Sequence, residues 1–434
     1  MKKRKLAVAA LALIFGTNTF AQNLSAISQQ ETSRIIKTLS ADDMQGRSAF
    51  TPGVDKAADF IAGEFKKTGL KPLPEENNFK QTFSVYRFTP QEKEVHLNGQ
   101  TVSADNVFAV TNYEELEWDK DINVATEVIK ESDNFRAAIS RINSLEQNVL
   151  ALVHPKHTDT FKAYQRYLTR GGIQQKKNEG NSKVFVLTDQ TVATDYKIEI
   201  ENQAEQLPLT NIAGMIEGKR KDEIVVFSGH YDHIGILTAV DGDSIANGAD
   251  DDASGTTAMI MLAKYYKKQP KPDRTLIFVA FTAEEIGGYG SRYFSEQLPP
   301  DQIVAMFNIE MVGKPSKFGP NTAYLTGFEK SNLGELMQKH LQGTTYSIHP
   351  DPYPEQNLFY RSDNATLARL GVPAHTISSV QIDQDKSYHS VNDEIEQLDM
   401  AHMTNMIKAI ALASRGIVYG NDTPTRVDKS TVRQ

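Results

Sequence analysis

Short apolar runs alternate with segments of helical periodicity over the second half of this chain of 434 residues. The apolar runs cover residues 224–227, 275–281 and 303–309, and apolar residues recur at helical spacing in residues 253–266, 290–297 and 331–341. Near-continuous apolar strands separated by helices are typical of a sheet that is buried on both faces. The pattern therefore predicts an α/β fold from about Asn211 onward.

The first half of the chain has a different pattern. Apolar residues recur at helical spacing from Pro52 to Gly69, and a glycine at that end is a typical helix stop. From residue 85 to about 202, charged and Asn-rich stretches surround short apolar runs at 148–153 and 183–188. We interpret this region as a smaller domain that is inserted between the helix and the α/β part.

The first 21 residues have the composition of a secretory signal peptide. A basic cluster at residues 2–5 precedes an apolar run at 6–16 and the small-residue pattern Thr19-Phe20-Ala21. The apolar run is shorter than the ~20 residues of a membrane anchor, and no later stretch is apolar over that length. We expect cleavage after Ala21 and an exported protein, periplasmic or secreted, without a membrane span.

The composition restricts the chemistry that the chain can perform. Lys and Arg number 47 against 55 Asp and Glu, a net charge of −8 that argues against binding to nucleic acid phosphates. The chain has no Cys. Disulfides, thiolate zinc sites, iron–sulfur clusters and Cys nucleophiles are therefore excluded, and a bound metal requires His, Asp, Glu or carbonyl ligands.

Ionisable residues follow each predicted strand at its carboxyl end. They are His230, Asp232 and His233 after the first run, Glu284 and Glu285 after the second, and Glu310 after the third. Two further groups are the acidic turn at residues 250–252, in front of a predicted helix, and Tyr388-His389. Ligands of open α/β sheets bind beyond the carboxyl ends of the strands. Imidazoles and carboxylates gathered there predict a site for zinc or a similar divalent ion.

Each of these groups also has a purely structural interpretation. Acidic residues at 250–252 are typical of a helix N-terminus, where they cap the helix and oppose its dipole. The same turn lacks the spacing of a calcium-binding loop. Paired Glu284 and Glu285 are typical of a solvated surface, and a single His389 is more often a surface residue than a ligand. His233 and His375 are not needed to complete a metal shell, and we interpret the remaining histidines as structural.

Taken in order along the chain, these motifs resemble the co-catalytic di-zinc exopeptidases. That family includes secreted bacterial aminopeptidases, aminopeptidase Y, glutamate carboxypeptidases and glutaminyl cyclases. The resemblance extends from about Asn211 to Leu412, and its motifs are residues 229–233, 247–255, 278–285 with Gly290-Ser291, 308–311, 361–363, 371–374 and 388–389.

The resemblance implies a three-layer α/β/α fold with a mostly parallel mixed sheet, plus a smaller inserted α+β domain. The division that follows is a signal peptide at 1–21, an N-terminal segment at 22–84 packing on the catalytic domain, the inserted domain at 85–205, a catalytic metallopeptidase domain at 206–420 and a polar tail at 421–434. We expect the tail to be loose.

The resemblance also implies two zinc ions per chain, each with three protein ligands and an open position. Asp251 bridges the two ions. His230 and Glu310 complete one site, and Glu285 and His389 complete the other. Three ligands and an open position are typical of catalytic rather than structural zinc.

The roles implied for the other residues concern proton transfer and orientation. Glu284 is the general base that acts on a water bridging the two metal ions, and Tyr388 donates a hydrogen bond to the developing oxyanion. Asp232 is expected to hydrogen-bond the far nitrogen of His230. The peptide bond between Asp251 and Asp252 is expected to be cis.

Two positions depart from the family pattern. Glu310 stands where aminopeptidases of the family usually have Asp, which shifts the carboxylate by about one methylene. Asp363 is followed by Asn364 where His is frequent, so the contribution of that loop to the substrate pocket is open.

The residues and the resemblance together predict an exported zinc-dependent exopeptidase, namely an aminopeptidase acting on N-terminal residues of peptides. Carboxypeptidase or dipeptidase action is one alternative, which a basic pocket would favour and for which Arg361 is a candidate. Glutaminyl cyclase chemistry is another, and it requires one metal ion. A catalytically inactive binding module is a third, although such proteins normally lose metal ligands. The sequence does not indicate residue preference, oligomeric state or the role of the insert.

Overall fold

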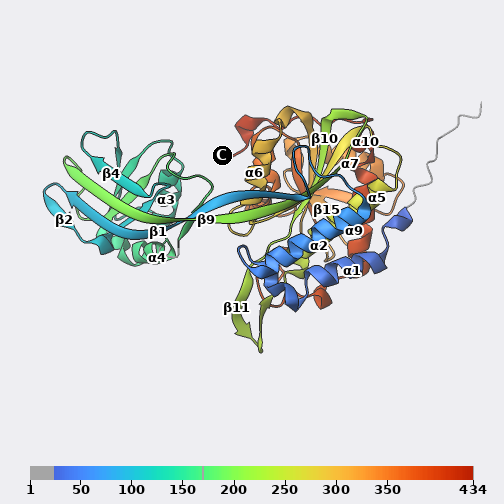
Figure 1. The fold of residues 1–434 in the computed structure, drawn as a ribbon, viewed down its shortest axis with the longest axis horizontal. Helices are drawn as coiled ribbons and strands as arrows, with labels where there is room; N and C mark the ends of the chain where they lie inside the picture. The colour runs from blue at the N-terminus through green and yellow to red at the C-terminus, as the bar shows by residue number, and fades with distance from the viewer. Residues whose placement is uncertain (1–23, 169–170, 434) are drawn as a thin grey trace, which may run out of the picture.

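The structure is a computed structural model that describes residues 24–168 and 171–433 (Figure 1). The predicted signal peptide at residues 1–21 lies outside the described residues. None of the helices in the described ranges is apolar over the length that crossing a bilayer requires.

A large mixed sheet forms the centre of the molecule. Its strands lie in the order β16 (Ser347–Pro350), β15 (Thr322–Leu325), β17 (Ala374–Ser378), β14 (Ile303–Ile309), β10 (Arg220–His230), β13 (Arg274–Phe281), β9 (Tyr196–Ile216), β1 (Lys80–Leu97) and β2 (Gln100–Val102). The central pairs β17–β14, β14–β10 and β10–β13 are parallel, whereas β9 pairs antiparallel with both β13 and β1. The predicted mostly parallel mixed sheet is therefore confirmed.

Helices cover both faces of this sheet. One face carries α1 (Gln29–Leu39), α2 (Pro52–Thr68), α5 (Gly255–Lys267), α7 (Leu333–Leu341) and α9 (Met400–Ala413), followed by α10 (Arg415–Val418). The other face carries α6 (Tyr289–Gln297) and α8 (Asn364–Arg369). The three-layer α/β/α architecture expected from the sequence is thus observed, with strands such as β13 buried along their whole length.

The helices occupy the segments that their periodicity predicted. The helix expected at residues 52–69 is α2, and it ends where Gly69 adopts φ 78°, a left-handed conformation that glycine reaches without a steric penalty. The helices expected at 253–266, 290–297 and 331–341 are α5, α6 and α7.

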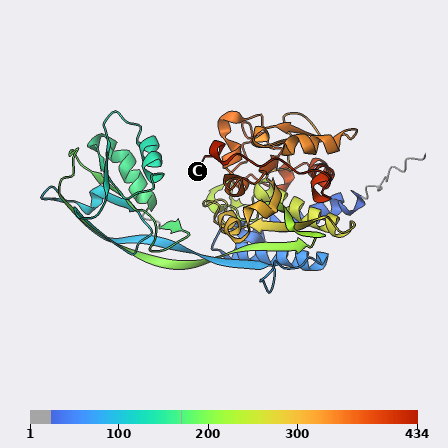
Figure 2. The same cartoon turned by 90° about the horizontal axis from the view of Figure 1, so that it is seen from above.

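A smaller lobe stands at the far end of a long two-stranded ribbon formed by β1 and β9 (Figures 1 and 2). Its own sheet has the order β3 (Val107–Val110), β8 (Lys183–Leu187), β6 (Val149–Val153) and β5 (Ala125–Ile129). The helices α3 (Phe135–Asn143) and α4 (Thr158–Leu168) pack on one face of that sheet. The far half of the ribbon, joined by β4 (Glu115–Asp119), packs on the other face.

The lobe is continuous with the main sheet rather than linked to it by loops. The proposed domain boundaries at residues 85 and 205 fall inside β1 and β9, where Val85 pairs with Leu207. A further strand, β7 (Gly172–Gln174), pairs with β1, and Tyr289 of α6 donates a hydrogen bond to the carbonyl of Ile173 at 2.6 Å. The ribbon thus ties the lobe to the helix layer beside the strand ends.

The C-terminal segment differs from the loose tail that its polar composition predicted. Val427 and Val432 are buried in the apolar cluster beneath α6 and α8. The buried Arg274 donates hydrogen bonds to the carbonyl of Asp422 and to the hydroxyl of Thr423. Two buried valines and the hydrogen bonds from Arg274 thus dock a segment whose average composition is polar.

A charged cluster ties the N-terminal helices to the main domain. Glu64 of α2 has a fully buried carboxylate that lies 2.6 Å from Nζ of Lys264, 2.8 Å from Arg34 and 3.0 Å from Lys67. These cations hold the pKa of Glu64 below its usual range even though burial acts in the opposite direction. The carboxylate therefore joins α1, α2 and α5.

Replacing Glu64 with Gln is expected to destabilise the fold by about 2 kcal/mol near neutral pH, because the ion-pair network loses its fully buried anion and only the partly exposed Glu31 still pairs with Arg34 and Lys264. A carboxylate whose pKa is lowered on folding stabilises the protein above its unfolded pKa, and this contribution disappears as pH falls through the folded value. The difference between wild type and Glu64→Gln in urea unfolding should therefore shrink below about pH 4.5. A difference that stays constant down to pH 3 would contradict this account.

Candidate metal centre and active site

The candidate residues meet because their strands run in parallel. In the register of β10 and β13, His230 lies opposite Phe281, so that Glu284 and Glu285 follow at the same edge of the sheet. On the other side, Ser228 of β10 pairs with Asn308 of β14, which places Glu310 just beyond the end of that strand. The carboxyl ends of three neighbouring strands thus deliver an imidazole and three carboxylates to one edge.

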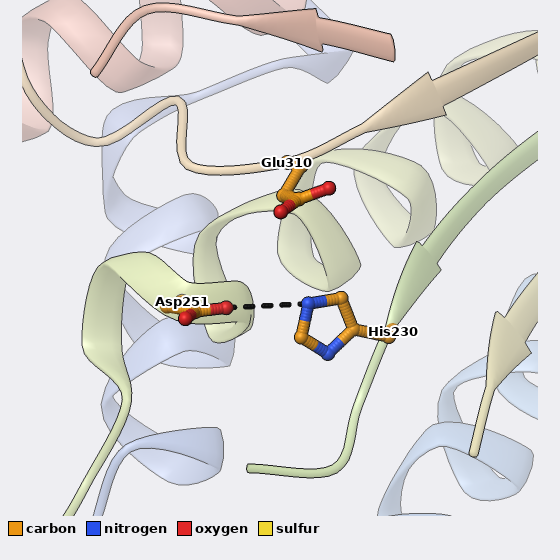
Figure 3. Close-up of side chains that lie close together, drawn as sticks. All are labelled: His230, Asp251 and Glu310. Carbon is orange, nitrogen blue, oxygen red and sulfur yellow. Dashed lines mark ion pairs between the residues drawn. The ribbon is translucent and has the colours of Figure 1, made fainter. Parts of the chain in front are cut away.

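One group of potential metal ligands consists of His230, Asp251 and Glu310 (Figure 3). One ligand atom of each lies within 4.8 Å of the other two, and Nε2 of His230 lies 3.2 Å from Oδ1 of Asp251. Nε2 of His230 and Oε2 of Glu310 are buried and have no hydrogen-bond partner. A divalent cation between these atoms would satisfy both.

A second group shares Asp251 with the first. Oδ2 of Asp251 lies 3.2 Å from Nε2 of His389, and this nitrogen lies 3.1 Å from Oε2 of Glu285. The two oxygens of Asp251 therefore face two different histidines, as a carboxylate that bridges two cations requires. The five side chains that the sequence singled out as ligands lie together.

His233 belongs to this second group, although sequence reasoning set it aside. Its Nδ1 lies 2.8 Å from Oε1 of Glu285 and 3.9 Å from Oδ2 of Asp251. His233, Asp251 and Glu285 form the second group whose ligand atoms all lie within 4.8 Å of one another, whereas His389 belongs to neither group of that spacing. The spacing of three residues after His230 was the available signal, but it does not show which carboxylate His233 meets.

The donor set suits zinc. It consists only of imidazole nitrogens and carboxylate oxygens, which are ligands that Zn²⁺ accepts. The carboxylates of Asp251 and Glu285 raise the pKa of His389 to about 10, which reflects the negative charge concentrated around its ring. Cations bound between these groups would neutralise that charge.

Two further aspartates hold the acidic turn in place. Asp393 accepts hydrogen bonds from the backbone N–H groups of Asp250 and Asp251, the latter at 2.9 Å. Asp252 accepts from the N–H groups of His230 at 3.1 Å, Gly255 at 3.0 Å and Met311 at 3.1 Å. The peptide bond between Asp251 and Asp252 is cis, as expected. Asp252 therefore links the end of β10, the start of α5 and the backbone after Glu310.

Asp232 acts differently from its expected role. Nδ1 of His230 lies 3.1 Å from the backbone carbonyl oxygen of Asp232, whereas the nearer carboxylate oxygen lies 3.8 Å away. The carboxylate instead accepts hydrogen bonds from the backbone N–H groups of Glu284 and Glu285. The carbonyl of Asp232 lies two residues after His230 on the same backbone and is the group that contacts the imidazole. The carboxylate of Asp232 therefore remains available to the backbone N–H groups that follow β13.

Arg47 is a buried cation behind the site; its sequence context resembles the N-terminal segment of the family but indicated no role for its side chain. Its guanidinium donates to the carbonyls of Tyr231 at 2.7 Å, Asn247 at 2.6 Å and Gly248 at 2.9 Å, and also to that of Leu39 at 2.6 Å. Burial lowers the pKa of Arg47, and the nearby aspartates of the site oppose that effect. The segment at residues 42–47 thus fastens both ligand-bearing loops to the N-terminal helices.

Glu284 and Tyr388 flank the ligand cluster. Burial raises the pKa of Glu284 well above its usual range, and Glu310, Asp363 and Glu285 act in the same direction. Tyr388 stacks on the ring of His389 at 3.9 Å between centroids, and its hydroxyl accepts a hydrogen bond from Arg361 at 3.3 Å. Both side chains line depressions that open onto the cluster.

Asn364 points away from these depressions. Its amide donates to the carbonyl of Phe359, and its carbonyl oxygen accepts from the hydroxyl of Thr376. The side chain is fully buried, so this departure from the family pattern fills the interior beneath the loop that carries Arg361 and Asp363.

Replacing His233 with Gln is expected to weaken zinc binding by roughly 10- to 100-fold, since residues that orient a metal-binding carboxylate have effects of that size. The measurement is competition with a chromogenic chelator. His96→Gln, in the small lobe, is the matched control. Equal affinities for wild type and His233→Gln would show that His233 does not orient Glu285.

Sequence comparison shows that the part of the chain carrying this arrangement is similar to a known family. The profile described as Peptidase family M28 matches residues 211–414. Leucine aminopeptidase 1 of Penicillium rubens is 28% identical over 242 residues, which are 52% of this chain and 60% of that protein. Aminopeptidase YwaD of Bacillus subtilis is 32% identical over 143 residues, 32% of this chain and 28% of that protein. The chain thus spans 60% or less of the length of these relatives.

Solved structures of similar fold cover nearly the whole chain. The aminopeptidase from Aneurinibacillus sp. strain AM-1 has a TM-score of 0.52 at 17% identity, covering 95% of this chain and 98% of its own. BSAP, a zinc aminopeptidase from Bacillus subtilis, has a TM-score of 0.54 at 17% identity, covering 94% of this chain and 99% of its own. At identities this low, the similarity shows a shared fold and nothing beyond it.

Proposed function

We propose that the protein is an exported zinc-dependent exopeptidase, an aminopeptidase that removes N-terminal residues from peptides; the match of residues 211–414 to the Peptidase family M28 profile supports this. The observation that carries the proposal is Asp251, whose two oxygens lie 3.2 Å from His230 and 3.2 Å from His389. A shared carboxylate between two half-sites, next to the uncoordinated carboxylate of Glu284, suits hydrolysis assisted by two metal ions.

Two zinc ions per chain fit the donor atoms. His230, Asp251 and Glu310 would hold one ion, and Asp251, Glu285 and His389 would hold the other, with His233 orienting Glu285. When bound, the ions supply Lewis-acid chemistry that activates water and polarises a carbonyl near neutral pH. A glutaminyl cyclase would need one ion, so counting zinc per chain by elemental mass spectrometry separates the two.

The chain's own residues account for the proton transfers. Glu284 takes a proton from the attacking water and passes it to the amine that leaves, because its carboxylate lines a groove beside the ligand cluster and is not one of the proposed ligands. Tyr388 donates its hydroxyl hydrogen to the carbonyl oxygen as negative charge develops there. Asp232 keeps Glu284 in reach by accepting the hydrogen bond from its backbone N–H at 3.1 Å.

A small depression next to Glu310 and Tyr388 suits the side chain of the N-terminal residue. Apolar atoms of Met311, Leu358 and Ile382 line it together with the hydroxyl-bearing Tyr324. It contains no acidic side chain other than the ligand Glu310, and Arg361 lies at its border. Because nothing there would pair with a second cation, we propose a residue of modest size that is not basic as the preferred N-terminus.

Digestion of a defined peptide mixture, with and without a chelator, tests the proposal. We expect mass spectrometry to detect stepwise loss of residues from the N-terminus, abolished by 1,10-phenanthroline and restored by zinc. Trimming from the C-terminus would favour the carboxypeptidase alternative. Absence of any cleavage by zinc-loaded protein would instead favour a binding module.

Zinc removal is also expected to lower thermal stability, because a ligand that binds only the folded state stabilises it by mass action. A thermal unfolding scan at 100-fold excess of free zinc over its Kd should show a gain of about 2.7 kcal/mol relative to the chelated protein. The Asp251→Asn variant should lose most of this zinc-dependent gain. A gain of equal size in that variant would argue against Asp251 as a shared ligand.

A further inference from the structure

A groove of about 320 Å³ opens on the other side of the ligand cluster and is lined by groups of opposite charge. Glu284, Glu285 and Asp363 line it as acids. Arg292 of α6, Arg369 at the end of α8 and Arg361 from the preceding loop line it as cations. Arg361 also borders the depression near Tyr388, whereas Arg292 and Arg369 line only this groove.

The three arginines have no acidic partner within the described residues, where none of them forms an ion pair. Nε of Arg369 donates to the backbone carbonyl of Arg433, and the Arg361 guanidinium meets the neutral groups of Tyr388 and Gln356. Arg292 stacks over the ring of Tyr289. Burial lowers the pKa of Arg369, and the charge of Arg292 acts in the same direction, so the two cations repel each other.

The scaffold that carries these cations is packed in place. The hydroxyl of Ser295 on α6 donates to the hydroxyl of Thr366 on α8 at 2.8 Å, and both helices contribute to the same apolar cluster. Guanidinium groups on two packed helices can bind a carboxylate in a bidentate manner with little loss of side-chain freedom. An anion between them would also relieve their mutual repulsion.

The position of the groove identifies which part of a substrate occupies it. In the proposed function, Glu284 gives its proton to the leaving amine, so the leaving group has to lie on the Glu284 side. The groove is that side, because Glu284 forms part of its wall. A leaving amino acid or peptide would then have its nitrogen at the acidic wall and the rest of its atoms toward the arginines.

From this arrangement we propose that Arg292, Arg361 and Arg369 bind a carboxylate of the leaving group, so that the preferred substrates are short peptides with an anion close after the scissile bond. The inference rests on the proposed function. The carboxylate has two possible sources, the C-terminus of a di- or tripeptide and an acidic side chain that follows the N-terminal residue.

Steady-state kinetics of zinc-loaded full-length protein test the proposal. We expect kcat/KM for Leu-Leu to exceed that for Leu-Leu-amide by roughly 10- to 100-fold, the effect of a hydrogen-bonded charge pair. A comparison of Leu-Glu-amide with Leu-Gln-amide measures the contribution of a side-chain carboxylate. Leu-p-nitroanilide, whose leaving group carries no carboxylate, tests the proposed aminopeptidase activity by itself.

The arginine variants decide whether the groove is responsible. In the Arg292→Gln/Arg369→Gln double variant, the ratio of kcat/KM for Leu-Leu to kcat/KM for Leu-Leu-amide should fall toward one. Arg369→Lys should retain part of the preference for Leu-Leu. Arg136→Gln, an exposed arginine of α3 in the small lobe, should leave the ratio unchanged. A ratio near one in wild type for both carboxylate sources, or a high ratio that survives in the double variant, would overturn the proposal.

A binding measurement keeps the inference separate from the proposed function. Calorimetric titration of Leu-Leu and Leu-Leu-amide into zinc-loaded Glu284→Gln protein yields the same ratio as an affinity, without hydrolysis. If Leu-Leu binds more tightly than Leu-Leu-amide while zinc-loaded wild type does not hydrolyse Leu-p-nitroanilide, the carboxylate site is supported and the aminopeptidase activity is rejected. Hydrolysis of the anilide by wild type, without a preference for either carboxylate source, would support the aminopeptidase activity and reject the carboxylate site.

Discussion

Glu284→Gln protein is expected to retain its zinc and to lose hydrolysis by roughly 10²- to 10⁴-fold in kcat, the usual contribution of a general base. The amide has nearly the shape of the carboxylate, so the backbone hydrogen bond from residue 284 to Asp232 can persist. What is lost is the acceptor for the water proton. The measurement is kcat on Leu-p-nitroanilide together with zinc content by elemental mass spectrometry.

Two outcomes would contradict this role for Glu284. Full turnover by the variant would show that another group is the base; Asp363 is the remaining carboxylate of the same groove that is not a proposed ligand. Loss of zinc together with activity would indicate that Glu284 is a ligand. Glu146→Gln, at an exposed position of the small lobe between α3 and β6, is the control for the loss of one negative charge.

Arg47→Met is expected to have the largest effect on stability, a loss of at least about 3 kcal/mol. The guanidinium is 0% exposed and donates to four backbone carbonyls, so its removal leaves buried acceptors unpaired and takes a cation away from the site's aspartates. Because Tyr231 directly follows the ligand His230 and Gly248 lies three residues before Asp251, zinc affinity should fall as well. Urea unfolding and chelator competition measure the two effects.

Arg47→Lys separates charge from geometry. A lysine keeps the cation but has one nitrogen in place of the fork that contacts the four carbonyls, so we expect it to recover part of the stability. Arg136→Met on the surface of the small lobe is the control for removing an arginine. A change of less than about 1 kcal/mol in Arg47→Met would show that solvent replaces the guanidinium without cost.

Local pattern was sufficient for much of the fold. The periodicity of residues 253–266 and the apolar run at 275–281 depend on neighbours only a few positions apart, and they became α5 and β13. The ribbon was not recognisable in the same way, because β1 and β9 are long strands whose exposed and buried positions follow two different packing partners. A boundary expected between domains therefore fell inside a continuous pair of strands.

Some residues of the candidate site could be predicted from local pattern, and others could not. His230, Glu285 and Glu310 were accessible because each directly follows an apolar strand, where parallel topology brings strand ends together. His233 and Asp393 were not, since their partners Glu285 and Asp251 lie 52 and 142 residues away in sequence. Asp232 had the right location but the wrong contact, because backbone direction decides which of its oxygens meets His230.

The sequence by itself determined that a metal in this protein must be held by nitrogen and oxygen, because it contains no Cys and carries His and carboxylates at strand ends. The tertiary structure decided how those ligands are held and what lies beside them. Arg47 reaches the site across 184 residues, and Arg292 and Arg369 share one groove wall only because α6 packs on α8. The sequence pattern predicts which face of each helix or strand is buried. Which side chains from distant parts of the chain contact one another depends on how the elements pack.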